Sequence, residues 1–303
     1  MTNKPFCIAA DWGTSNLRLW LMAENGAVLR ELRSEEGLTR VVDGDFTSVL
    51  ERNAATLGAS AALPVIICGM AGSRQGWKEA PYMDTPASLD DVVKNAVNVA
   101  HSNRDIRILP GIAQRSLENP DVMRGEETQL LGLPVDGAEQ TIVMPGTHSK
   151  WVRLEGRSVA SFKTFMTGEL FHLFSTASLL RHSMNDASRT LTDDPHFLRS
   201  CQAMIDEPGL FTAQLFSIRA SSLLHGASPS QAKAALSGIL IGAEIGTARK
   251  LFSPKDIVLV GTGGLGALYE TALGLAGISV SIVDAERICR DGLLSAAKAF
   301  WPA

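Results

Sequence analysis

The chain contains one short turn pattern twice, in widely separated places. The first copy, Ile8 to Arg18, is typical of a strand, a tight turn at Gly13-Thr14 and a second strand. The second copy, Ile142 to Val152, repeats this plan around Gly146-Thr147. Each copy continues into a further glycine-containing turn and a third strand. The duplication predicts two similar domains, each opening with three strands joined by tight turns.

A glycine turn between two strands exposes backbone N–H groups, which suit phosphate oxygens. Two such turns, one in each half, predict phosphates gripped between two domains. Lys150 could serve a phosphate as a point charge or could be a solvated loop lysine, and His148 could bind phosphate or cap its turn. The turn residues that we expect to bind phosphate are Gly13, Thr14, Ser15, Asn16, Gly146, Thr147, His148 and Lys150.

Length and charge restrict the class of protein. A chain of 303 residues favours two domains over a single core. The net charge of −4 provides no basic excess for nucleic acid. The apolar run before Asp11 is too short for a signal peptide core or a membrane span. The four cysteines and six histidines show no metal-ligand spacing, so we expect reduced thiols, no structural zinc and a cytoplasmic location.

The order of predicted elements is strand-strand-strand followed by alternating α/β, run twice. A glycine-rich loop, Gly69 to Trp77, follows an apolar strand at its carboxyl end, where open α/β sheets bind ligands. We place the domain boundary after Gly132-Leu133-Pro134, giving domains 1–135 and 136–303 around a central cleft. The expected strands cover 6–10, 17–22, 27–33, 64–68, 106–109, 141–144, 257–260 and 279–283. The expected helices cover 89–99 (with a capping box at Ser88), 122–131, 168–182, 237–250 and 291–300.

Asp11 stands between a buried apolar run and the first turn. A carboxylate at the end of a strand can hold Mg²⁺ directly or through water. Alternatively, Asp11 hydrogen-bonds only its own turn. The second Gly-Thr turn in the chain favours the metal-binding interpretation.

Two adjacent carboxylates, Glu126 and Glu127, lie just before the second half of the chain. A kinase needs a carboxylate that accepts the proton of the attacking hydroxyl, and either residue is a candidate. Adjacent helical residues point about 100° apart, so at most one faces a substrate. Both could instead favour the N-terminus of a helix by their charge alone.

Three arginines are candidates to bind an acidic substrate, because a guanidinium grips a carboxylate bidentately. They are Arg18, Arg74 and Arg124, and a surface role is an equal alternative for each.

The segment Gly261 to Gly266 has the G-x-G-x-x-G spacing, and Asp284 follows the next strand. This is the fingerprint of a dinucleotide-binding site. The residues that remain suffice for one βαβ unit only, so we prefer a glycine surface that contacts adenosine. In the helix before it, Gly238, Gly242 and Gly246 recur every fourth residue, which allows close approach of a helix or a ligand.

With these residues in view, the chain resembles the 2-dehydro-3-deoxygalactonokinase family of the actin/Hsp70/sugar-kinase superfamily. The resemblance covers nearly the whole chain and is most specific in Arg124-Gly125-Glu126-Glu127-Thr128-Gln129 and Pro145-Gly146-Thr147-His148-Ser149-Lys150-Trp151. It implies two ribonuclease H-like (actin-like ATPase) domains with mixed sheets. It also implies ATP-dependent phosphorylation of 2-dehydro-3-deoxy-D-galactonate at its 6-hydroxyl, in galactonate breakdown.

The resemblance implies roles for particular residues. Asp11 would bind Mg²⁺, Glu126 or Glu127 would be the base, and the adenosine would meet Gly261, Gly263 and Gly264. The substrate-binding residues would be Arg18, Gly72, Ser73, Arg74, Trp77, Arg124, Thr167 and Glu169. The expected partners are ATP and a small sugar acid, with neither nucleic acid nor membrane, and a homodimer is a candidate assembly.

Three other functions remain open. An exopolyphosphatase-like phosphohydrolase shares the superfamily, but its basic channel is not evident. An ATP-driven binding or chaperone module would need a partner-binding domain, which we do not find before Ala303. An NAD-linked oxidoreductase depends on the glycines of 261–266.

Overall fold

The computed structural model describes residues 4–100, 103–134, 139–185 and 190–302, and it divides into two compact units. The first unit contains Met1–Ala138, Glu155–Ser161 and Ala285–Ala303, and the second contains Glu139–Leu154 and Phe162–Asp284. The domain boundary expected between residues 135 and 136 lies outside the described residues and stays a prediction. The grouping of Ala285–Ala303 with the first unit differs from the sequence-based division.

The sheet of the first unit has the order β3-β2-β1-β4-β8-β7. Strand β1 pairs antiparallel with β2, and β1, β4 and β8 are parallel to one another. All five residues of β4 are buried, as its continuous apolar run predicts. The strands are β1 (Pro5–Trp12), β2 (Leu17–Ala23), β3 (Val28–Ser34), β4 (Val65–Gly69), β7 (Val97–Val99) and β8 (Ile106–Ile108).

A second six-stranded sheet repeats this arrangement, with the order β15-β14-β11-β12-β13-β6, and most of it belongs to the second unit. Here β11, β14 and β15 are the parallel strands, matching β1, β4 and β8. The strands are β11 (Glu139–Met144), β12 (Ser149–Glu155), β13 (Ser158–Phe165), β14 (Asp256–Val260) and β15 (Ser279–Val283). The duplicated opening predicted from the turns is therefore confirmed at the level of sheet topology.

The expected helix at 122–131 is wrong in its first half. Residues Asp121–Met123 form a strand, β10, which pairs antiparallel with β9 (Ile112–Gln114), and β9 pairs with β5 (Met83–Asp84). Helix α3 (Glu126–Leu131) begins only after Gly125, whose φ of +108° an L side chain rarely adopts. The two glutamates are consequently the first two residues of a short helix.

The expected helix at 89–99 is shorter than the pattern suggests. Helix α2 (Leu89–Lys94) ends before Val97–Val99, which pair as β7 with β8, and the β-branched Val97 and Val99 suit a strand. Ser88 is the N-cap residue but makes no side-chain capping bond, so the capping box is not formed. Ser88 belongs to β6 (Ala87–Ser88), which pairs with Ser158 and Val159 at the start of β13.

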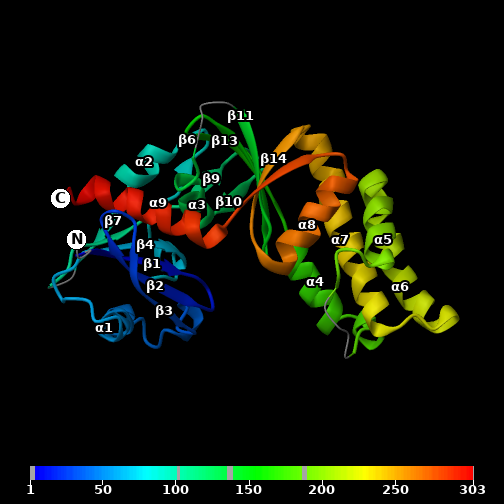
Figure 1. Cartoon of the computed structure of the whole chain (residues 1–303), viewed down its shortest axis with the longest axis horizontal. Helices are drawn as coiled ribbons and strands as arrows, with labels where there is room; N and C mark the ends of the chain where they lie inside the picture. The colour runs from blue at the N-terminus through cyan, green and yellow to red at the C-terminus, as the bar shows by residue number, and fades with distance from the viewer. Residues whose placement is uncertain (1–3, 101–102, 135–138, 186–189, 303) are drawn as a thin grey trace. The chain divides into compact units, whose positions relative to one another are not determined.

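The C-terminal helix α9 (Ala285–Phe300) belongs to the first unit because it packs on α3, β1 and β4. Gly292 fits directly against α3, since a Cβ there would lie 2.0 Å from the carbonyl oxygen of Thr128. Figure 1 shows α9 in red alongside α3. The remaining long helix of this unit is α1 (Phe46–Thr56).

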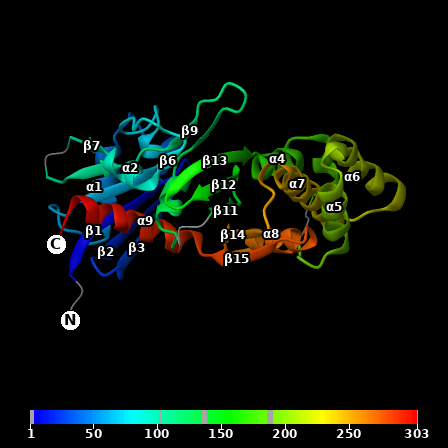
Figure 2. The ribbon, with the colours of Figure 1, turned by 90° about the horizontal axis from the view of Figure 1, so that it is seen from above.

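Helices α5 (Pro195–Asp206), α6 (Phe211–His225) and α7 (Pro229–Phe252) of the second unit lie side by side (Figure 2). The glycine stripe of α7 allows this packing, because a Cβ at Gly238 or Gly242 would lie 2.4 Å from a carbonyl oxygen of α5. The stripe therefore serves close helix–helix approach. The unit also contains α4 (Thr167–Thr176) and α8 (Gly263–Leu275). The 3₁₀ turns of the chain are η1 (Leu38–Arg40), η2 (Met70–Gly72), η3 (Leu179–Ser183) and η4 (Pro208–Leu210).

Within the described parts of the chain, no helix has the length and apolar character needed to cross a membrane.

Candidate functional site

The first turn joins β1 to β2 and is held by backbone hydrogen bonds. The Gly13 N–H donates to the Asn16 carbonyl at 2.9 Å, and Thr39 of η1 donates from its N–H to the Thr14 carbonyl at 3.0 Å. Thr14, Ser15 and Asn16 are exposed. Hydrogen bonds from η1 therefore hold the turn in place, while its exposed residues remain accessible to a ligand.

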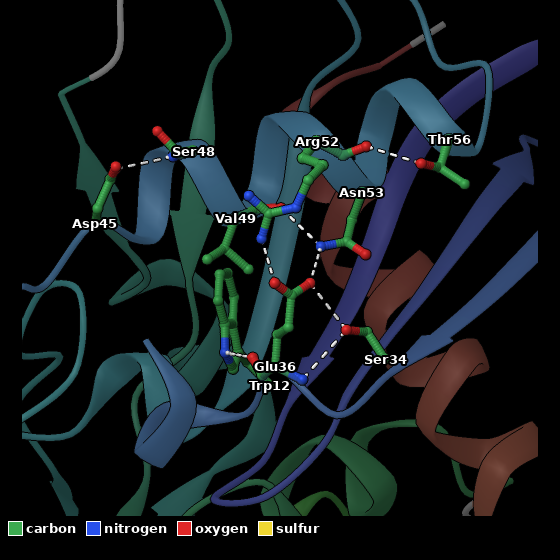
Figure 3. Close-up of polar contacts among 9 residues, drawn as sticks. All are labelled: Trp12, Ser34, Glu36, Asp45, Ser48, Val49, Arg52, Asn53 and Thr56. Atoms are coloured by element: carbon green, nitrogen blue, oxygen red, sulfur yellow. Dashed lines mark hydrogen bonds and ion pairs between the residues drawn. The ribbon is translucent and has the colours of Figure 1, made fainter. Parts of the chain in front are cut away.

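A polar cluster on α1 supports the same region (Figure 3). The Trp12 indole donates to the Glu36 carbonyl at 3.1 Å, and the Glu36 carboxylate contacts Arg52 and accepts from Asn53 at 2.8 Å. The Asn53 amide, assisted by Ser34 and Arg52, lowers the pKa of Glu36 below its usual value. The cluster fixes the segment that follows β3 against α1.

Asp11 lies near the end of β1, directly opposite Arg18 of β2 in the antiparallel register. It is half-buried. Burial raises the pKa of Asp11, the Arg18 guanidinium lowers it, and the Glu126 carboxylate raises it. A Cβ at Gly69 would lie 3.5 Å from Asp11 Oδ1, and a Cβ at Gly125, just before Glu126, would lie 3.6 Å from the Gly69 Cα, so the start of α3 lies near the end of β1.

The donor set around Asp11 fits Mg²⁺ only with help from a ligand. Among the described residues, no three His, Cys, Asp or Glu side chains gather closely enough to hold a metal. Magnesium is commonly bound by one or two carboxylates, with water and substrate phosphates completing its shell. Asp11 can therefore hold a nucleotide-bound Mg²⁺ but does not form a complete protein site.

Glu126 and Glu127 have different surroundings, although they are adjacent. Glu126 is half-buried and accepts from the Arg124 N–H at 2.9 Å. Glu127 is completely buried and accepts from the Gly125 N–H at 2.7 Å and the Thr128 hydroxyl at 3.1 Å. Burial, with a smaller effect of Glu126, raises the pKa of Glu127 to about 8. At neutral pH Glu127 is mostly protonated and lies out of reach of a ligand, whereas Glu126 is partly exposed.

The Arg124 guanidinium is packed beside the glycine-rich loop. Its Cζ lies 4.3 Å from the Tyr82 ring centre, and its Nη2 donates to the Ala80 carbonyl at 2.9 Å. Its Nε and Nη1, together with the Ser73 hydroxyl, are buried without a hydrogen-bond partner in the described structure. Gly72 is packed against this group, since a Cβ there would lie 2.9 Å from Nη1. Buried donors of this kind are costly unless an acceptor reaches them.

The other predicted substrate residues of the first unit lie elsewhere. The Arg74 side chain is 87% exposed and its Nε lies 3.7 Å from a Glu79 carboxylate oxygen. Trp77 packs on the apolar core, stacked on Phe46 with ring centres 6.0 Å apart. The contacts given for Arg74 and Trp77 are thus with other residues and not with the Arg124 guanidinium.

The second turn joins β11 to β12 and rests on the N-terminus of α4. The Glu169 N–H donates to the Thr147 carbonyl at 2.9 Å, and Glu169 Oε2 lies 2.5 Å from His148 Nε2. A Cβ at Gly168 would lie 2.4 Å from the Gly146 carbonyl oxygen, so the turn and the helix touch through their backbones. Lys150 is only 4% exposed and is therefore not a solvated loop lysine.

Sequence reasoning missed the function of Glu244, a fully buried carboxylate of α7. Four donors converge on it: Ser149 Oγ at 2.7 Å, Trp151 Nε1 at 2.8 Å, Tyr269 Oη at 2.6 Å and Thr167 Oγ1. Burial raises the pKa of Glu244, and these four hydrogen bonds lower it. The available signal was an acidic residue inside an otherwise apolar helical stretch, which is costly without partners.

A pocket of about 450 Å³ opens in the second unit beside the turn. Its polar lining includes Thr147, Thr190, Lys233 and Ser237, and its apolar lining includes Phe171, Leu240, Leu265 and Leu268. Gly264 lines it, whereas Gly261 donates its N–H to Val283 and Gly263 begins α8 with φ of +71°. The glycines of 261–266 thus lie at the start of α8 in one β14-α8-β15 unit, and their contact with adenosine stays a prediction.

The family model described as 2-keto-3-deoxy-galactonokinase matches residues 11–296. The "Probable 2-dehydro-3-deoxygalactonokinase DgoK1" of Rhizobium meliloti (strain 1021) is 48% identical over 305 residues, covering all of both chains. The 2-dehydro-3-deoxygalactonokinase of Escherichia coli (strain K12) is 35% identical, covering 96% of this chain and 97% of that protein.

Solved structures agree with the sequence matches. A crystal structure from Sinorhizobium meliloti, assigned as a 2-dehydro-3-deoxygalactonokinase, has a TM-score of 0.94 at 48% identity and covers 98% of this chain and 100% of its own. The activator of 2-hydroxyisocaproyl-CoA dehydratase from Clostridium difficile, solved with bound ADPNP, has a TM-score of 0.51 at 11% identity and covers 97% and 95%. The latter shows the actin-like ATPase fold alone. This chain belongs to the 2-dehydro-3-deoxygalactonokinase family and is a carbohydrate kinase.

Proposed function

We propose that the protein transfers the γ-phosphoryl group of ATP to the 6-hydroxyl of 2-dehydro-3-deoxy-D-galactonate, releasing ADP, in galactonate catabolism. The observation that carries this proposal is that Gly69 lies close both to Asp11 and to Gly125, the residue before Glu126, in a chain that belongs to a kinase family. Asp11 suits a metal, and Glu126 suits a base whose charge affects Asp11. The sequence identity of the named relatives supports the choice of sugar acid.

The oxygen of the 6-hydroxyl attacks the γ-phosphorus while Glu126 accepts the hydroxyl proton, and ADP leaves from the opposite side. Asp11 would hold Mg²⁺ together with the nucleotide, and the ion would supply positive charge to the phosphoryl oxygens. Gly13 and Thr14 of the first turn, and Thr147 and Lys150 of the second, bind phosphate oxygens. Glu127, which is buried and mostly protonated, positions the start of α3 instead of touching the substrate.

Arg124 and Ser73 bind the carboxylate of the sugar acid, because an anionic acceptor would give a partner to buried donors that have none among the described residues. The nucleoside part of ATP occupies the pocket that Gly264 and Leu265 line in the second unit. The ATPase fold shared with a protein solved with bound ADPNP supports this assignment. Arg18, Arg74, Trp77, Thr167 and Glu169 stay predictions as substrate contacts.

The decisive experiment is a coupled ADP-release assay over 2-keto-3-deoxy acids, with the gluconate and galactonate epimers side by side. We expect the highest kcat/KM with the galactonate epimer and a phosphomonoester on O6, identified by ³¹P NMR. Release of inorganic phosphate without a sugar acid would favour the phosphohydrolase. A thermal shift with NAD but not with ATP would favour the oxidoreductase.

A further inference from the structure

The Glu244 side chain accepts hydrogen bonds from four other side chains and has no part in the steps above. Its Oε1 accepts from Ser149 and Trp151, and its Oε2 accepts from Thr167 and Tyr269. The donors come from β12, α4 and α8, while Glu244 itself lies on α7. One carboxylate therefore joins four elements.

Two of these links lead directly to the second turn. Ser149 is the first residue of β12, two positions after Thr147, and Thr167 is the first residue of α4. The next residues of α4 hold the turn, through the backbone contact of Gly168 and the hydrogen bond from Glu169 to Thr147. The turn is thus attached to Glu244 from both of its flanks.

Two of the four links also lead to the nucleotide pocket. Thr167 and Tyr269 line the pocket beside Thr147, while Glu244 lies behind them and does not line it. A change at Glu244 would consequently move groups that line the pocket without removing a group that touches a ligand.

Stability alone does not explain a carboxylate at this position. Burying a charge is costly, and replacing a buried ionic group by apolar residues is often neutral or stabilising. What four converging donors provide is a single fixed geometry for the elements that carry them.

We propose that Glu244 is a positioning residue for nucleotide binding, which fixes the second turn and the N-terminus of α4 at the ATP phosphates. This inference rests on the proposed function, in which that turn binds ATP. It assigns Thr167 to the support of the turn, in contrast to the sugar-acid contact that the family resemblance implies.

The test compares steady-state kinetics of Glu244→Ala, Ser149→Ala and Thr167→Val with the wild type, well below the melting temperature. Glu244→Ala removes all four bonds, and the other two variants each remove one link to the turn. Ser228→Ala is the matched control, because it breaks the capping box of the same helix α7 without touching the cluster. The three quantities measured for every variant are the KM for ATP, the KM for the sugar acid and the melting temperature.

We expect Ser149→Ala and Thr167→Val to raise the KM for ATP by about 3- to 10-fold, with the KM for the sugar acid within about twofold of wild type. Glu244→Ala should raise it further. Ser228→Ala should lower only the melting temperature. If Glu244→Ala does not fold, the two single-link variants decide the question.

Three results would overturn the inference. The KM for ATP could stay unchanged in both single-link variants, or both KM values could rise together as the melting temperature falls. Thr167→Val could also raise only the KM for the sugar acid, which would return Thr167 to the substrate. If the wild-type enzyme releases no ADP with the sugar acid, the proposed function is wrong. If the wild type is active but the variants do not behave as expected, only this inference is wrong.

Discussion

The two Gly-Thr turns occupy the same place in two similar sheets, yet their surroundings differ in charge. Two residues before Gly13 stands Asp11, and two residues before Gly146 stands Met144. The second turn rests on the N-terminus of α4, where Glu169 contacts His148, and it is followed by the buried Lys150. We propose that the residues around the two turns have different tasks, with metal binding and proton transfer at Asp11 and Glu126, and phosphate binding at Thr147 and Lys150.

The supports of the two turns differ in the same way. Trp12 of the first unit donates to the backbone of Glu36, whose carboxylate makes a partly exposed cluster with α1 (Figure 3). Trp151 of the second unit donates to the buried carboxylate of Glu244. A surface cluster can be lost at small cost, but a buried carboxylate with four donors cannot. We expect substitutions of Asp11 or Glu126 to change kcat, substitutions of the surface cluster to have little kinetic effect, and substitutions around the second turn to change ATP binding.

The largest effect is expected for Glu126→Gln. The amide cannot accept the proton of the attacking hydroxyl, so kcat should fall by about 10²–10⁴-fold. The KM for ATP should stay close to that of wild type, because Glu126 does not bind phosphate. Steady-state kinetics and ATP-induced thermal shifts measure both quantities. Full activity of this variant would remove Glu126 as the base and leave Glu127 to be tested.

Asp11→Asn tests the charge difference between the turns directly. Loss of the carboxylate should weaken Mg²⁺ binding and reduce kcat by about 10²–10³-fold at fixed Mg²⁺, with partial recovery as Mg²⁺ is raised. The matched control is Met144→Leu at the equivalent position of the second turn, a volume-conserving change that should leave kcat unchanged. Similar losses in both variants would mean that the asymmetry has no role in the reaction.

Glu127 and Glu244 are both buried carboxyl groups, but they differ in how their charge is supported. Glu127 accepts from Gly125 and Thr128, whereas four side chains donate to Glu244. The pKa of Glu127 is raised from 4.5 to about 8, so between these pH values the native state keeps a proton that the unfolded chain loses. Stability contributed by this proton is complete below about pH 4.5 and disappears as the pH rises to about 8.

Replacing Glu127 by glutamine removes this pH dependence. The amide can still accept from Gly125 and can donate to the Thr128 hydroxyl. We expect the variant to gain about 2–4 kcal/mol over wild type between pH 4.5 and pH 8, measured by urea unfolding across that range. Parallel stability curves for the two proteins would show that Glu127 is not a buried, protonated group.

Much of this arrangement could be predicted from local sequence. The three opening strands and both turns follow from short apolar runs and adjacent glycines, and the structure places them within one or two residues of the expected limits. The close packing along Gly238, Gly242 and Gly246 also follows from a pattern within one helix. Local patterns were sufficient where the partner of each residue lies nearby in the chain or where spacing alone defines a face.

The rest depended on partners that are distant in sequence. The segment Asp121–Met123 becomes a strand because β9 pairs with it, and helix α3 begins after Gly125. The sequence immediately around Val122 indicates neither the strand pairing nor the later start of the helix. The choice of Arg124 over Arg74 required the burial of its donors. The four donors of Glu244 come from positions 25 to 95 residues away, so no motif could have linked them.

A lysine-to-methionine change in the second turn should have a smaller effect than the changes in the first unit. Lys150→Met keeps the length of the side chain and removes its charge, which should raise the KM for ATP by about tenfold, equivalent to about 1.4 kcal/mol. The KM for the sugar acid serves as the internal control and should stay constant. A fall in kcat without a change in KM would place Lys150 in the chemical step instead of in binding.

The smallest effect is expected for Glu36→Gln, the surface counterpart of Glu244. Because the pKa of Glu36 is lowered in the native state, its contribution to stability is present above its usual pKa and is lost as the pH falls through the native value. The side chain is 31% exposed, so the loss at neutral pH should be under about 1 kcal/mol, with kcat and both KM values unchanged. Thermal unfolding at pH 7 and under acidic conditions measures it, and wild type and variant should converge in acid. A large kinetic effect of Glu36→Gln would contradict the comparison, because it would mean that the first turn, like the second, depends on a charged support behind it.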